Sequence, residues 1–299
     1  MTPRTTQITA FLVGMIGIAL FAIMDAVMKG LVLALGTYAT LLWRSFVGVG
    51  LAGALFAASR PQWPARATLN IHLTRGAVST VMGVLFFWGL ARVPLAQAIA
   101  LAFIAPLIAL VLAAAMLGER VEKRTIGASF VAFVGVAVIF LGQAQADLGR
   151  DAMLGSLAIV ISALLYALNL ILMRRQSQAS GPAEAAFFQN VTVSALLLAA
   201  LPILGTSMPA AEHWPWILLA ALLSTGSLLL LSWAYARAEA SYLAATEYSS
   251  FLWAMLLGWL VFGERVSPYT LAGATLIVAG CLLAARRPED VRPALEVAA

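Results

Sequence analysis

The fold prediction depends first on the stretch Tyr242–Val266, YLAATEYSSFLWAMLLGWLVFGERV. It is long enough to cross a bilayer, because about 20 residues at ~1.5 Å rise span the ~30 Å hydrocarbon core. It nevertheless carries Glu247 near its start, and a charge at that depth is costly unless it faces a partner or a wet cavity. Its closing letters, Gly-Glu-Arg-Val, also close an earlier apolar run at 118–121. The stretch therefore predicts a membrane span, an internal repeat and a functional site.

The composition indicates a polytopic membrane protein. Of the 299 residues, 63% are hydrophobic and 10% are charged, whereas a soluble domain carries about 25% charged residues. The net charge of +5 comes from short loops and forms no stripe of the kind that binds nucleic acid. The chain has no ATP-binding motif, its two histidines are far apart, and its single cysteine, Cys281, forms no internal disulfide. We therefore expect no cofactor and no metal.

Ten apolar runs, separated by short breaks rich in Gly and Pro, predict an all-α fold of ten transmembrane helices. The runs are 8–32, 38–58, 70–90, 95–117, 125–143, 152–174, 183–204, 214–236, 241–262 and 268–285. Pro106 lies in the middle of the fourth run and should kink that helix. Of the 18 Lys and Arg residues, 13 fall on the side of the N-terminus and 4 on the other side. This bias predicts an inner-membrane protein with both termini cytoplasmic.

An offset of 145 residues aligns the two halves of the chain without a gap. The matched pairs include Phe21 with Tyr166, Trp88 with Trp233, Arg92 with Arg237, Thr125 with Thr270 and Gly135 with Gly280. Each half contains five spans, and an odd number inserts the second half into the membrane upside down. Inverted repeats are a recurring design of secondary transporters. We predict two inverted five-helix repeats, 1–145 and 146–287, followed by a disordered cytoplasmic tail at 288–299.

Several short segments carry a resemblance to a known family. They are FAIMDAVMK at 21–29, Trp43-Arg44, Arg75-Gly76, Ala105-Pro106-Leu107, Thr246-Glu247-Tyr248 and the two Gly-Glu-Arg segments. In these residues the chain resembles the drug/metabolite transporter superfamily and, within it, the EamA-type ten-helix carriers. Asp25, Lys29, Glu247 and Tyr248 are most similar to the pattern of bacterial S-adenosylmethionine and riboflavin carriers and some metallophore exporters. Members of the family transport in both directions, so the resemblance implies no direction.

Asp25 and Arg44 are the first candidates for the site. They fall in the first and second spans at similar depths, roughly 9–12 Å below the outer surface, which permits an ion pair. The pair would either fix helix packing or hold a carboxylate for substrate binding or ion coupling. Burial offsets much of the Coulomb gain of such a pair, which favours function. Lys29, one turn further on, is expected to snorkel to the outer interface.

Arg75 and Glu247 form the second candidate pair, because both lie within roughly 10 Å of the inner surface. We predict that they pair as an inner gate or a substrate anchor. Uncharged polar and aromatic residues within the spans complete a plausible cavity, although each could instead join two helices. They are Trp88, Gln97, Tyr166, Asn169, Gln189, Asn190, Trp233, Tyr248 and Trp253. For the two Gly-Glu-Arg segments, topology is a sufficient explanation.

The sequence therefore predicts a secondary active transporter that works by alternating access, and not an enzyme. Its substrate is expected to be a small polar or zwitterionic metabolite, because Trp and Tyr share the candidate cavity with charged groups. Protons are a candidate coupling ion. The protein is expected to lie in the lipid bilayer, and a monomer and a homodimer are equally compatible with the sequence. One alternative is an exporter of amino acids or drugs with the same fold, and another is a lipid-linked sugar flippase with a laterally open groove. A membrane-embedded lipid enzyme is disfavoured, because no catalytic cluster is present.

Overall fold

The computed structural model describes residues 3–59, 63–117, 123–145, 149–235, 237 and 240–285. Within these residues the chain is helical and contains no strand. The elements are α1 (Pro3–Leu35), α2 (Thr37–Ala58), α3 (Arg66–Leu90), α4 (Leu95–Ala102), α5 (Ala105–Leu117), α6 (Lys123–Gln145), α7 (Gly149–Ala179), α8 (Pro182–Leu204), the 3₁₀ turn η1 (Ala211–His213), α9 (Trp214–Tyr235), α10 (Ala240–Phe262) and α11 (Pro268–Ala285). The tail at 288–299 and the first Gly-Glu-Arg segment at 118–120 lie outside the described residues.

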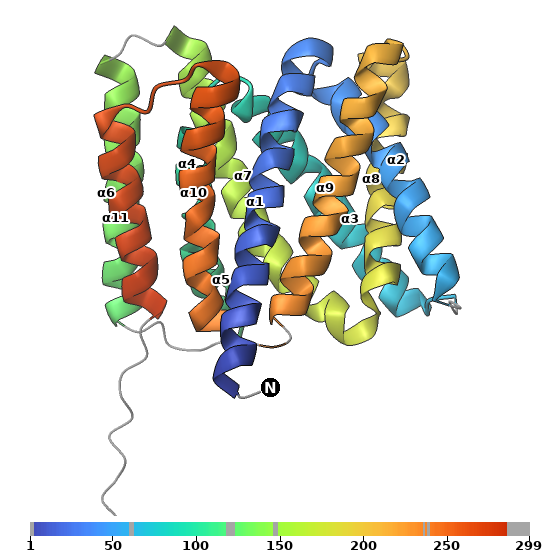
Figure 1. Cartoon of the computed structure of the whole chain (residues 1–299), viewed down its shortest axis with the longest axis horizontal. Helices are drawn as coiled ribbons and strands as arrows, with labels where there is room; N and C mark the ends of the chain where they lie inside the picture. Colours follow the sequence, from blue (N-terminus) through green and yellow to red (C-terminus); the bar gives the residue numbers. More distant parts are fainter. Residues whose placement is uncertain are drawn as a thin grey trace, which may run out of the picture.

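The helices coincide with the predicted spans to within a few residues, and the all-α polytopic fold is confirmed. By length and composition, six described stretches can cross a membrane: Gln7–Leu35, Thr37–Ala58, Arg66–Leu90, Gly149–Ala179, Pro182–Leu204 and Ala211–Leu231. Shorter apolar helices fill three further places, at Leu95–Ala109, Ile126–Gly142 and Pro268–Leu283. The helices stand side by side, and α1 begins at the same edge of the bundle at which α11 ends (Figure 1).

The fourth predicted span is divided into α4 and α5. Phe103 and Ile104 separate the two helices, and Pro106 occupies the first turn of α5. Proline has no N–H, so the carbonyl of Ala102 cannot accept the usual bond from four residues on. The thiol of Cys281 on α11 donates to the carbonyl of Phe103 across 3.3 Å. The expected kink at Pro106 is therefore a complete break, stabilised by a neighbouring helix.

The packing of the helices repeats itself when the two halves of the chain are exchanged. Helix α1 packs along α9, and its counterpart α7 packs along α3, which is the counterpart of α9. Counterparts also pair with each other, α2 with α8 and α6 with α11. Helix α7 begins at the edge of the bundle opposite to the start of α1 (Figure 1). The fold thus consists of two repeats of opposite direction.

The α6–α11 contact shows the repeat at atomic detail. A Cβ added to Gly135 would lie 2.6 Å from the carbonyl oxygen of Gly273, and one added to Gly280 would lie 2.7 Å from that of Ala128. The two contacts exchange under the 145-residue offset, because it matches Gly135 with Gly280 and Ala128 with Gly273. Only residues without a side chain in the way allow the backbones to approach this closely.

Helix α4 is the most deeply buried element among the described residues. All seven residues from 95 to 101 are buried, and α4 packs against α10 and α7. A helix that is apolar on every side is typical of the interior of a bundle. This position brings the N-terminus of α4 close to the connections at one end of the molecule.

Candidate functional site

Asp25 and Arg44 face each other without forming the ion pair that their depth permits. Asp25 on α1 is 3% exposed and makes no hydrogen bond or ion pair to the described part of the chain. Arg44 on α2 is close enough to attract it electrostatically, but no contact within 4.0 Å joins them. Two opposite charges held apart in the interior are costly unless a third group lies between them. The expected pair is thus replaced by two ionisable groups that are held apart.

Orphaned polar atoms gather on the same helix as Arg44. In the described chain, five buried side-chain N or O atoms meet no protein partner, and four of them lie on α2 and α8. They are the Oγ1 of Thr40, the Nε1 of Trp43, the Nε of Arg44 and the Oε1 of Gln189. Thr40, Trp43 and Arg44 follow at helical spacing and share one face of α2. Buried polar groups normally have partners, so this face is suited to binding a polar ligand.

Arg75, on the other side of the candidate cavity, is held by α7. Its Nε donates to the Oδ1 of Asn169 across 3.2 Å, and its NH1 donates to Gln176. The hydroxyl of Ser79 also donates to Asn169, across 3.2 Å. Tyr166 on the same helix lies within electrostatic reach of both Arg75 and Glu247. The structure thus brings Arg75, Tyr166, Asn169 and Glu247 together, and a direct pair between Arg75 and Glu247 stays a prediction.

The remaining predicted residues make contacts between helices or within one helix. Gln97 is buried and donates to Ser156 on α7 across 3.1 Å. Asn190 donates to the carbonyl of Ala186 one turn earlier, across 2.9 Å. The ring of Tyr248 lies edge-on to Phe103, with 5.4 Å between the ring centroids. These contacts give each side chain a structural role beside the predicted one.

Trp88 and Trp233 are both covered by an arginine one turn further on. The guanidinium of Arg92 lies 3.6 Å from the ring centroid of Trp88, and that of Arg237 lies 4.1 Å from Trp233. Each arginine also donates to the carbonyl of its own tryptophan, across 2.8 and 3.2 Å. The two pairs are 145 residues apart and have the same geometry, so the repeat preserves a helix end. Trp253 is half-buried on α10.

A buried cluster that the sequence did not predict consists of Lys29, Val93, Leu95 and Glu264, and we call it the outer latch because it lies at the end of the bundle that is expected to face outward. The ammonium of Lys29, 3% exposed, donates to the carbonyl of Val93 across 2.6 Å and forms an ion pair with Glu264. The other oxygen of Glu264 accepts the N–H of Leu95, the first residue of α4, across 2.7 Å. Lys29 therefore does not snorkel to the interface as expected. The latch joins α1, the start of α4 and the α10–α11 connection.

The backbone at the end of α10 positions Glu264. Gly263 has φ +64°, and the N–H of Glu264 bonds back to the carbonyl of Gly258 across 3.0 Å. The N–H of Gly263 bonds to the carbonyl of Trp259 across 3.1 Å, which is the αL ending that glycine favours. An added Cβ on Gly258 would lie 2.7 Å from the carboxylate of Glu264, so the space over α10 is needed for that side chain. The second Gly-Glu-Arg segment thus has a structural role beyond topology.

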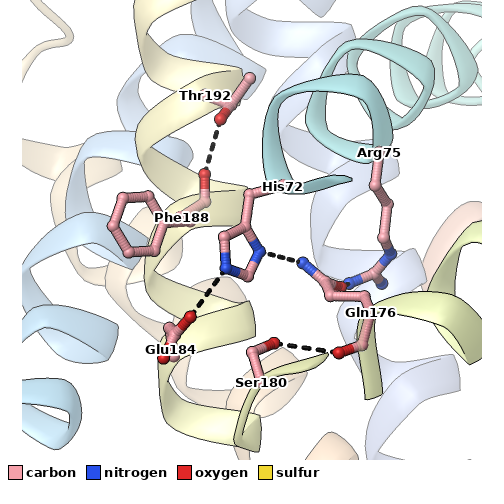
Figure 2. A network of polar contacts seen from close by, with 7 residues as sticks. All are labelled: His72, Arg75, Gln176, Ser180, Glu184, Phe188 and Thr192. Carbon is pink, nitrogen blue, oxygen red and sulfur yellow. Dashed lines mark hydrogen bonds and ion pairs between the residues drawn. The ribbon is translucent and has the colours of Figure 1, made fainter. Parts of the chain in front are cut away.

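A second cluster outside the prediction lies where α3 begins, and we call it the histidine relay: Arg75, Gln176, His72 and Glu184. His72 is fully buried, and its Nε2 lies 3.0 Å from the carboxylate of Glu184 on α8. Its Nδ1 lies 2.5 Å from the side-chain nitrogen of Gln176 on α7 (Figure 2). The described residues bring no three His, Cys, Asp or Glu side chains together as a metal would require.

Comparison with known proteins now adds to this geometry. Residues 8–141 and 153–286 each match the EamA-like transporter family. The chain belongs to the EamA-like transporter family. The two matches correspond to the two repeats and cover most of the helices. As an EamA-like member of the drug/metabolite transporter superfamily, the protein is a membrane transporter and not an enzyme.

Relatives of this EamA-like transporter are named for different solutes. The pseudopaline exporter CntI of Pseudomonas aeruginosa is 25% identical over 271 residues, which cover 89% of this chain and 92% of the relative. The riboflavin transporter of Rhizobium johnstonii is 30% identical, over 77% of this chain and 73% of the relative. A probable terminal-alkyne amino-acid exporter of Streptantibioticus cattleyicolor is 30% identical, over 81% and 80%.

A solved structure supports the fold of the EamA-like transporter. A crystal structure covers 94% of this chain and 100% of its own chain with a TM-score of 0.60 and 20% sequence identity. At that identity the likeness concerns the fold alone. The solute and the mechanism therefore have to be argued from the side chains of this chain.

Proposed function

We propose that this EamA-like protein is a secondary active transporter for a small zwitterionic metabolite. The observation that carries the proposal is the separation of the buried Asp25 from Arg44, which lies within electrostatic reach but not in contact. A solute with an ammonium and a carboxylate group satisfies both charges at once. The unpartnered Nε of Arg44 and Nε1 of Trp43 supply further donors to a carboxylate on the same helix face. One relative is named as an amino-acid exporter, which agrees with this class.

The proposed mechanism is alternating access between two states of the inverted repeats. The outer latch supports it, because a buried ion pair and two backbone contacts tie both halves of the chain together at one end. In this mechanism the latch closes the outer end while the solute is exchanged at the inner end, and it separates in the opposite state. The repeats are taken as 1–145 and 146–287, with both termini in the cytoplasm and the chain in the inner membrane.

The test is ligand binding by the purified full chain. We expect neutral amino acids with both charged groups to raise the thermal midpoint, and riboflavin and N-acetylated amino acids to raise it less. Asp25→Asn and Arg44→Gln should each abolish the shift. Asp151→Asn and Arg150→Gln remove the same groups from the exposed start of α7 and serve as controls. A shift that survives in both site variants would contradict the proposal.

Transport itself is measured in proteoliposomes that contain the same variants. Counterflow of a labelled amino acid should be fast in the wild type and in the two controls, and lost in Asp25→Asn. Counterflow does not depend on the direction of physiological transport, so it tests an importer and an exporter equally. Transport under an outward-directed gradient of the coupling ion then distinguishes an exporter from an importer. The two relatives that are named as exporters favour the exporter.

A further inference from the structure

The histidine relay has a fixed direction of hydrogen bonding. Arginine has only donors, so the side-chain oxygen of Gln176 must be the atom that accepts from Arg75. The amide nitrogen of Gln176 therefore faces the Nδ1 of His72, 2.5 Å away, and Nδ1 has to be the acceptor. The remaining ring nitrogen, Nε2, then carries the proton and donates to Glu184 across 3.0 Å. The arrangement selects one neutral tautomer of His72.

The surroundings of the imidazole leave it few other partners. Its ring stacks on Phe188 of α8, with 4.9 Å between ring centroids and 7° between the planes. The charged groups that face the relay are Glu184 from α8 and Arg75 from α3 itself, and α7 contributes the uncharged Gln176. Figure 2 shows His72 between Glu184 and Gln176, with Arg75 beyond the amide. His72 is 0% exposed and the side chain of Glu184 is 19% exposed.

We propose that His72 is a proton-binding site that controls the position of Arg75 in the transport cavity. An incoming proton can only add to Nδ1, because Nε2 already carries one. The new N–H would face the N–H groups of Gln176, so the amide has to turn and present its oxygen to the ring. Its nitrogen then faces Arg75, a donor meets a donor, and Arg75 loses this partner. Glu184, already in contact, balances the charge of the imidazolium.

Protonation of His72 would affect the candidate cavity through Arg75. After the amide turns, Arg75 keeps its bond to Asn169 and is free to move toward Tyr166, which lies nearby on α7. Linkage requires that a solute which binds Arg75 also changes the affinity of His72 for protons. This inference rests on the proposed transport function for its purpose, but the test below needs no solute.

The test uses nitrogen NMR of the purified full chain, labelled with ¹⁵N in histidine and arginine. The chain has two histidines, so His213→Gln leaves His72 as the single histidine signal. We expect a neutral ring protonated at Nε2 at high pH and an imidazolium at low pH. The Nε–H signal of Arg75, identified by its loss in Arg75→Lys, should change with the same midpoint pH. In His72→Gln that signal should not titrate.

Gln176→Met distinguishes the relay from a simple charge effect. It removes the amide that links the ring to Arg75 but keeps the positive charge of Arg75. The relay predicts a mixture of neutral tautomers of His72 and an Arg75 Nε–H signal that no longer changes when His72 binds a proton. A direct charge effect between the two side chains predicts that the Arg75 signal still changes. Arg175→Gln, an exposed neighbour on α7, is the matched control and should leave the joint change in place.

Two results overturn the proposal, and neither requires an altered relay. One is a neutral His72 protonated at Nδ1, and the other is an Arg75 signal that stays constant while His72 titrates. Both are read in the His213→Gln chain, so they decide the matter even where Gln176→Met does not fold. A chain that shows the joint titration but binds no zwitterion keeps the relay and loses the proposed substrate. A chain that binds the zwitterion but shows no joint titration keeps the proposed substrate and loses the relay.

Discussion

The two ends of the bundle are both tied by buried polar clusters, but the clusters are built differently. The outer latch joins a full ammonium and a carboxylate, and backbone groups at Val93 and Leu95 complete it. The histidine relay joins side chains only, and its central group is charged only when protonated. A latch of fixed charges opens when competing contacts form, whereas a relay through an imidazole also responds to protons. In the proposed mechanism, the latch closes one end of the bundle and the relay senses protons at the other.

The largest expected effect comes from breaking the latch. Glu264→Gln leaves Lys29 charged, 3% exposed and without its counterion. Removal of one partner of a buried pair costs about 3–5 kcal/mol, which should appear as a lower thermal midpoint of the purified chain. The double variant Lys29→Met/Glu264→Gln removes both charges and should recover part of that loss. Equal stability of the single variant and the wild type would show that the ion pair does not stabilise the fold.

The next largest effect concerns the close contact of α6 with α11, in which the two repeats make equivalent contacts. Gly135→Ala and Gly280→Ala each place a Cβ within 2.8 Å of a carbonyl oxygen, which should cost about 1–3 kcal/mol as overpacking. Gly127→Ala on the same helix meets nothing within 4 Å and should gain stability by helix propensity. Chemical unfolding in detergent measures all three. Unequal losses at Gly135 and Gly280 would break the proposed equivalence of the ends.

A smaller effect sharpens the contrast at the relay. Glu184→Gln makes the same chemical change as Glu264→Gln at a similar side-chain exposure, 19% against 17%, but its partner is a neutral ring. We expect a loss under about 1 kcal/mol, because no buried counter-charge is left unpaired. The readout is again the thermal midpoint, measured at a pH where His72 is neutral by NMR. A loss as large as that of Glu264→Gln would mean that the relay is a second latch.

The smallest effect concerns the two tryptophan–arginine pairs. Arg92→Lys and Arg237→Lys keep the charge but lose the stacked guanidinium, so each should cost about 0.5–1 kcal/mol. The repeat predicts equal losses, because the two arginines lie 3.6 and 4.1 Å from their rings. The change in tryptophan emission on each substitution gives an independent measurement. A loss confined to one pair would show that the two helix ends serve different purposes.

Most of the fold could be predicted from the sequence, because membrane spans are local. Each apolar run had to be long enough to cross the bilayer, and the offset that matches Trp88 with Trp233 revealed the repeat. Pro106 marked the break in the fourth span for a local reason, its missing N–H. The positions of these features depend on neighbours in the chain and not on distant contacts.

The site was predicted less well, because it depends on contacts between distant segments. Lys29 and Glu264 are 235 residues apart, and each alone reads as an interfacial charge. The role of His72 similarly depends on its contacts with Gln176 and Glu184, which lie more than 100 residues further along the chain. Asp25 and Arg44 could be proposed as candidates because charges stand out in apolar runs. Their separation in space could be known only from the packing of α1 and α2.

The single thiol of the chain has a practical consequence. Cys281 is 4% exposed and engaged with the carbonyl of Phe103, at the break between α4 and α5. A thiol shielded in this way reacts slowly with maleimides, since only an accessible thiolate is a good nucleophile. A cysteine introduced at an exposed position can therefore be labelled selectively in the otherwise native chain. Spectroscopic distance measurements between the repeats need no cysteine-free background, and the native residue can remain in place beside the break between α4 and α5.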